Sequence, residues 1–124
     1  MKHLEGSKKR VSTLLAMPRT AESKSRFSDE LWEAYTAVET AIAMSKTVFG
    51  GYKTLGVMKK IRTSKKSNPL SMTSEEFSAV MSLISSELGI AQTCFSELRS
   101  DPGLEHARKA RDELKRLLLS LESS

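Results

Sequence analysis

The apolar residues of this 124-residue chain are chiefly of the kinds that favour helices. Leu, Ala and Met together number 31, whereas Val and Ile together number 9. Unbranched and γ-branched side chains keep their rotamer freedom in a helix, whereas β-branched side chains lose theirs. The chain also lacks sustained alternation of apolar and polar residues and has no Asn-Gly or Asp-Gly hairpin signal. We therefore expect an all-α fold, and the length suits a single domain.

Three long helices are predicted from apolar residues that recur every three to four positions. They span about 29–49, 74–99 and 102–121, and a shorter helix is expected at 52–62. Ser28 is the expected N-cap of the first helix, and Thr73 with Glu76 forms a capping box for the second. The short connection at Asp101-Pro102-Gly103 places the last two helices in an antiparallel hairpin. The predicted architecture is a single-domain antiparallel helical bundle.

The core of this bundle is predicted to form from one apolar stripe on each long helix. The stripes are Leu31, Tyr35, Val38 and Ile42; Phe77, Val80, Met81, Ile84, Leu88, Ala91, Phe95 and Leu98; and Leu114, Leu118 and Leu121.

Residues 1–26 are predicted to be a basic, flexible N-terminal arm, with the bundle domain at 27–124. The arm contains seven basic and two acidic residues. Val11, Leu14 and Leu15 could support a short helix, which Pro18 would end. The following stretch is polar and rich in serine, with little apolar surface to bury.

No combination of residues suggests catalysis or metal binding. The two histidines, His3 and His106, are far apart in the sequence, and His106 is expected at the surface. The single cysteine, Cys94, is expected to be buried and inert. One Cys and two distant His cannot form a zinc site of finger spacing. We expect a protein that is not an enzyme and binds no cofactor or metal.

The single cysteine also fits a reducing compartment, so an intracellular protein, cytoplasmic or nuclear, is expected. No apolar run approaches the length needed to span a bilayer, and the N-terminus lacks the apolar region of a secretory signal. The K-K-x-R pattern at 59–62 fits a short nuclear-import signal, although such tetrapeptides are frequent by chance.

Charge is segregated along the chain, which has 20 basic and 15 acidic residues and a pI near 9.5. Residues 53–68 contain six basic residues and no acid, whereas 27–52 and 69–98 are acidic overall. The like charges of such a block repel one another, so the block is tolerated when it is solvated or when a polyanion binds it. The predicted phosphate-binding residues are Lys53, Lys59, Lys60, Arg62, Lys65 and Lys66, assisted by Lys8, Lys9 and Arg10.

Two further surfaces are predicted. Arg108, Arg111 and Lys115 form a secondary basic row on the last helix, unless the interleaved Glu105 and Asp112 make it an ion-paired solvent face. Small serines recur on the second long helix and, with an aromatic and a methionine, could form a self-association face. Its residues are Trp32, Ser78, Met81, Ser82 and Ser85.

Two functions remain open from the sequence. The first is a non-enzymatic nucleic-acid-binding protein, with RNA the expected partner, that contacts the phosphate backbone without reading sequence. The second is an interaction adaptor or self-associating helical module that binds a partner protein through an apolar groove, formed by Trp32, Tyr35, Met81 and the serine row. An acidic protein is the alternative partner for the basic block. A homo-oligomer is expected in either case.

Overall fold

The computed structural model describes residues 2–49 and 68–122, and all regular structure within these ranges is helical. Four α-helices form: α1 (Lys2–Ala16), α2 (Lys24–Phe49), α3 (Ser74–Ser96) and α4 (Ser100–Glu122). A single 3₁₀ turn, η1 (Ala21–Ser23), precedes α2. The predicted all-α class is therefore confirmed. The shorter helix expected at 52–62 lies outside the described residues.

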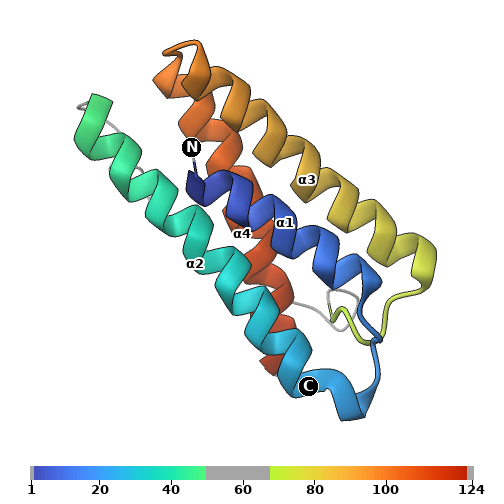
Figure 1. The fold of residues 1–124 in the computed structure, drawn as a ribbon. Coiled ribbons are helices and arrows are strands. Elements are labelled where there is room, and N and C mark those ends of the chain that lie inside the picture. Colours follow the sequence, from blue (N-terminus) through green and yellow to red (C-terminus); the bar gives the residue numbers. More distant parts are fainter. Residues whose placement is uncertain (1, 50–67, 123–124) are drawn as a thin grey trace.

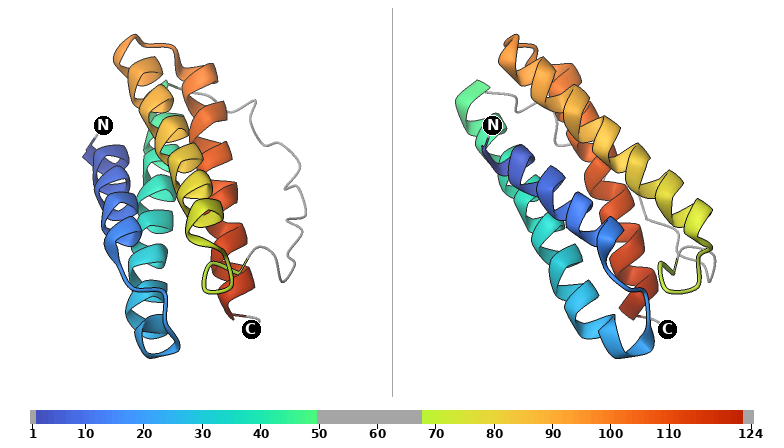
Figure 2. Two further views of the ribbon diagram at one scale, coloured as in Figure 1. Left: turned by 90° about the vertical axis from the view of Figure 1, so that its right-hand side faces the viewer. Right: turned by 45° about the vertical axis from the view of Figure 1, so that its right-hand side comes forward.

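The four helices pack around one core in a closed ring (Figures 1 and 2). Helix α1 packs against α2 and α3, and α4 packs against the same two neighbours. Helices α2 and α3 therefore occupy opposite corners of the ring, as do α1 and α4. No helix within the described ranges combines the length and apolar character needed to cross a bilayer.

Helix α1 corrects the prediction of a separate arm at residues 1–26. Its residues Leu4, Val11 and Leu14 are buried in the common core. Ser7 occupies the remaining position of this stripe, and its hydroxyl donates a 2.9 Å hydrogen bond to the carbonyl of Ala34 on α2. The sequence pattern was weak because a polar residue fills a core position. Residues 2–16 belong to the bundle.

Helix α2 begins at Lys24, about five residues before the predicted start. Ser28 consequently lies inside the helix and is not its N-cap. The additional turn contains Phe27, which is fully buried with its ring 5.8 Å from that of Phe77 on α3. Burial of this aromatic side chain accounts for the earlier start, because it adds a large apolar surface to the core.

Helix α3 begins as predicted, with Thr73 and Glu76 exchanging the two hydrogen bonds of a capping box. Its predicted core residues Phe77, Ile84 and Leu88 are buried. Leu98 contradicts its predicted place on this stripe, since it is 76% exposed and has a φ of 61°. The helix has already ended at Ser96, so the helical periodicity no longer applies at Leu98.

The turn from α3 to α4 has the hydrogen bonds of a Schellman motif. The amide of Leu98 donates to the carbonyl of Phe95 at 3.1 Å, and the amide of Arg99 donates to that of Cys94 at 2.7 Å. Leu98 holds the left-handed position that glycine normally occupies in this motif. An L-residue in this conformation is strained because its Cβ approaches the following carbonyl.

Helix α4 begins at Ser100, two residues before the predicted start, and presents its predicted leucines to the core. These buried residues include Leu114, Leu118 and Leu121. Gly103, in the first turn, lies directly against the ring of Phe95 on α3. A Cβ built at Gly103 would stand 2.8 Å from the Phe95 Cε1 atom. Glycine at this position therefore allows α3 and α4 to approach closely near their connecting turn.

Candidate nucleic-acid interface

The main predicted phosphate-binding block lies outside the described residues. It comprises Lys53, Lys59, Lys60, Arg62, Lys65 and Lys66. The structure therefore tests only the assisting residues on α1 and the secondary row on α4.

Arg10 on α1 forms ion pairs with two glutamates of α2. Its guanidinium donates to both carboxylate oxygens of Glu30 on α2, at 3.1 and 3.0 Å, and pairs with Glu33 one turn further along. The hydrogen bond with Glu30 is the main cause of a raised pKa for Arg10. This side chain joins α1 to α2, so it is a poor candidate for a phosphate contact.

Lys8 and Lys9 occupy different surroundings on α1. Lys9 is exposed to solvent, whereas Lys8 is half-buried and reaches across to α3. The Lys8 Nζ atom lies 3.6 Å from the position of a Cβ built at Gly89. The absence of a side chain at Gly89 leaves room for the Lys8 ammonium beside the backbone of α3.

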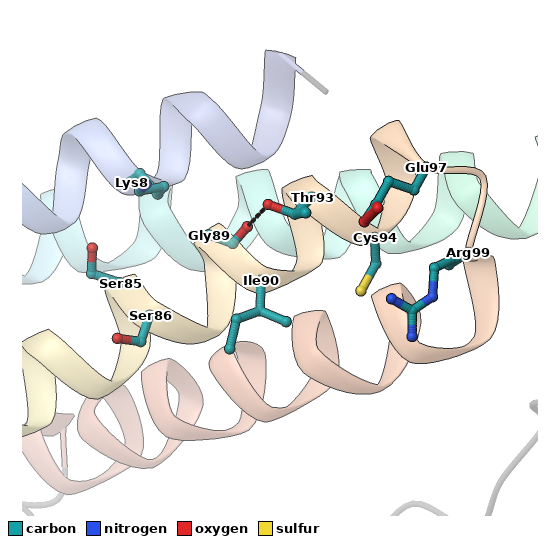
Figure 3. Close-up of a pocket in the computed structure, with 9 residues that line it drawn as sticks. All are labelled: Lys8, Ser85, Ser86, Gly89, Ile90, Thr93, Cys94, Glu97 and Arg99. Carbon is teal, nitrogen blue, oxygen red and sulfur yellow. Dashed lines mark hydrogen bonds between the residues drawn. The ribbon is translucent and has the colours of Figure 1, made fainter.

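A shallow groove of about 500 Å³ follows α3 beside Lys8 (Figure 3). Its lining combines two cations, three hydroxyls and one carboxylate with an isoleucine, a glycine and the only cysteine. The residues are Lys8, Ser85, Ser86, Gly89, Ile90, Thr93, Cys94, Glu97 and Arg99. This groove offers donors for an anion, but the Glu97 carboxylate lines it as well. Its mixed charge makes it weaker than the 53–66 block as a phosphate site.

In the predicted secondary basic row, the middle residue, Arg111, forms ion pairs within the chain. Arg111 donates a 3.2 Å hydrogen bond to Glu39 on α2 and also pairs with Asp112 at 3.1 Å. Arg108 and Lys115 are half-buried. Arg111 therefore connects α4 to α2, in agreement with the ion-paired alternative for this helix face.

The predicted self-association face is not continuous. Met81 is fully buried in the core, so it cannot contact a second copy. Trp32 lies on α2, at the opposite corner of the ring from the serines of α3, and donates a 3.1 Å hydrogen bond to Glu122 on α4. The serines themselves border α1: Ser85 and Lys8 line one groove, and Ser78 lines another with Leu15. The helix that approaches this small-residue row is α1 of the same chain.

Two further contacts between distant segments were also not anticipated from the sequence. Arg19, assigned to the arm, donates to the carbonyls of Pro69 and Met72 and lies 4.6 Å from the Phe77 ring centroid. His106 Nδ1 lies 2.5 Å from Glu87 Oε2, which joins α4 to α3. The hairpin prediction could have revealed the second pair, because both residues lie about two to three turns from the connection.

Cys94 is buried, as predicted, with 5% of its surface exposed. Among residues 2–49 and 68–122, no group of three or more His, Cys, Asp or Glu side chains is arranged to hold a metal ion.

Comparison of the chain with protein-family models, curated proteins and solved structures finds no match.

Proposed function

We propose that this protein is a non-enzymatic helical scaffold that binds nucleic acid, RNA in particular, through the basic residues at 53–66. The observation that carries the proposal is the distribution of net charge. The described residues contain 14 of the 20 basic residues and all 15 acidic residues, so together they carry a net charge of −1. The whole excess of positive charge therefore belongs to the 53–66 block.

The ion pairs of the bundle strengthen this contrast. Arg10 pairs with Glu30 and Glu33, Arg111 with Glu39 and Asp112, and Arg116 with Glu113. These basic groups already have anionic partners within the chain. The six at 53–66 have no acidic neighbour in sequence, so a polyanion is the expected counter-charge.

The proposed mode of binding is sequence-independent. Lys and Arg that neutralise phosphates release condensed counterions, and this entropy gain does not depend on the bases. Tyr52 is the only aromatic residue close to the block, which is too few for a platform that stacks successive bases. We therefore expect similar affinity for RNAs of unrelated sequence, with Lys8 and Lys9 adding weaker contacts.

The scaffold itself is inferred to be an antiparallel bundle, since short connections join α1 to α2 and α3 to α4. Self-association and a cytoplasmic or nuclear location remain predictions from the sequence.

The proposal is tested by removing the same charge from two places. One variant replaces Lys59, Lys60, Lys65 and Lys66 with Gln, and the matched control replaces Lys24, Arg26, Lys109 and Arg116 with Gln on the bundle. Affinity for two unrelated 20-nucleotide RNAs is measured by fluorescence anisotropy over a range of salt concentrations. We expect the first variant to reduce the salt slope by roughly 0.7 per lost contact, equally for both RNAs, and the control to change it little.

Two results would refute the proposal. One is an absence of RNA binding by the unaltered protein at low salt, and the other is an equal loss in both variants. If the first variant instead lost binding to an acidic protein while RNA binding was absent, the adaptor function would replace it.

A further inference from the structure

The segment that precedes α3 is joined to the connection between α1 and η1 by one arginine. We call this segment, residues 68–73, the strap; it lies beside that connection (Figure 1). The Nη1 group of Arg19 donates to the carbonyls of Pro69 and Met72 on the strap, at 2.9 and 2.6 Å. The guanidinium carbon of Arg19 also lies 4.6 Å from the centroid of the Phe77 ring on α3. One side chain therefore contacts both the strap and the first turn of the helix that follows it.

The strap is itself folded against the bundle. Asn68 is 8% exposed, and Leu70 and Met72 are partly buried against the core. The amide of Ser71 donates to the carbonyl of Asn68 at 3.0 Å, which closes a turn, and the amide of Leu70 donates to the Asn68 Oδ1 atom at 2.9 Å. Arg19 therefore holds a segment that already has its own hydrogen bonds.

A guanidinium group suits this contact. It presents several N–H donors in one plane, so it can donate to two carbonyls while its face lies against an aromatic ring. A lysine has the same charge but only a compact ammonium head. The ion pairs within residues 2–49 and 68–122 do not include Arg19, in contrast to Arg10 and Arg111. The charge of Arg19 is thus directed at carbonyl oxygens of the strap.

The strap is also continuous in sequence with the proposed phosphate-binding block. Lys65 and Lys66 precede Asn68 by three and two residues. An anchor at the strap limits the distance of these two lysines from the bundle. It therefore reduces the conformational entropy that is lost when they bind a phosphate chain. If only molecules with an anchored strap bind well, their fraction of the population scales the apparent affinity.

We propose that Arg19 is a positioning residue for nucleic-acid binding, because it fixes the end of the 53–66 block to the bundle through the strap. This inference rests on the proposed function. Arg19 acts through the strap and does not contact phosphate itself. Its loss lowers the affinity for RNA and leaves the number of phosphate contacts unchanged.

The first experiment measures RNA affinity and its salt dependence for Arg19→Gln and Arg19→Lys, with the full chain and the two RNAs described above. We expect both variants to bind several-fold more weakly and to keep the salt slope of the unaltered protein. Arg116→Gln is the control for a lost positive charge, and Ser7→Ala is the control for a lost hydrogen bond between elements. Both controls should bind normally, with circular dichroism showing that every variant is folded.

The second experiment tests the strap without RNA, by hydrogen exchange. The amides of Leu70 and Ser71 should exchange several-fold faster in Arg19→Gln than in the unaltered protein, whereas the amides of Ile84 and Leu114 in the core should change little. Equal acceleration at all four amides, or unchanged exchange at Leu70 and Ser71, would overturn the anchor and leave the proposed function standing.

The RNA measurements distinguish the remaining outcomes. Normal affinity of Arg19→Gln, or full affinity of Arg19→Lys, would overturn the positioning role. A salt slope reduced by roughly 0.7 in Arg19→Gln alone would instead make Arg19 a phosphate contact. An absence of RNA binding by the unaltered protein would refute the proposed function, and the positioning role with it, whatever hydrogen exchange showed for the strap.

Discussion

Both helix pairs contribute apolar side chains to the core, but polar contacts between the helices are more numerous in the α1–α2 pair, whereas the α3–α4 pair has an unusually close glycine–aromatic contact. Between α1 and α2, Ser7 donates to the carbonyl of Ala34, and Arg10 pairs with Glu30 and Glu33. Between α3 and α4, Gly103 lies directly against the buried Phe95 ring. A helix with few apolar residues can thus belong to a core when its polar side chains find partners.

The largest expected effect tests whether α1 is as much part of the core as α3. Leu14→Ala and Ile84→Ala each remove a fully buried side chain. We expect each to lower the free energy of unfolding by about 2–5 kcal/mol, measured by urea denaturation. The exposed Leu15→Ala is the control beside Leu14. If Leu14→Ala cost less than about 1 kcal/mol while Ile84→Ala cost more, α1 would be a separate arm after all.

An intermediate effect tests the close fit of α3 and α4. The methyl group of Gly103→Ala would meet the Phe95 ring, which must then move within a packed core. We expect a loss of about 1–3 kcal/mol, although alanine has the higher intrinsic helix propensity. Gly6→Ala on α1 is the control, because no atom lies within 4 Å of a Cβ there. Thermal unfolding that showed Gly103→Ala to be stabilising would contradict the fit described here.

The smallest expected effect is an increase in stability, and it concerns the turn between α3 and α4. Leu98→Gly removes the left-handed strain at an exposed position and sacrifices little buried surface. We expect a gain of about 0.5–1 kcal/mol in the free energy of unfolding, visible as a raised Tm. Leu98→Ala keeps the Cβ, so it should give no such gain. Equal effects of the two substitutions would show that the backbone strain is not what matters.

The two pairs also differ in how well the sequence predicted them. Apolar periodicity correctly identified the core residues Ile42, Ile84, Leu88 and Leu118, because large side chains repeat there without interruption. In α1 the repeat is interrupted by Ser7, whose burial depends on a carbonyl 27 residues away and cannot be inferred from local pattern.

The phosphate-binding residues were also hard to predict, because whether a basic side chain is free depends on residues far away in the sequence. Charge counts suggested phosphate contacts for Arg10 and Arg111, yet both are paired with glutamates of α2. The sequence could supply the charges but not the cross-helix distances that determine which of them are already neutralised. Met81 was predicted both for the core stripe and for the self-association face, and its full burial confirms the first of these.

The ring arrangement of the helices also implies an order of assembly. Contacts within α1–α2 and within α3–α4 join residues that are close in sequence, so forming them closes short loops and costs little chain entropy. The α2–α4 and α1–α3 contacts join distant segments and are favourable only once two helices are already presented together. We therefore expect each pair to form early and the two pairs to dock in the later, slower step, which completes the common core.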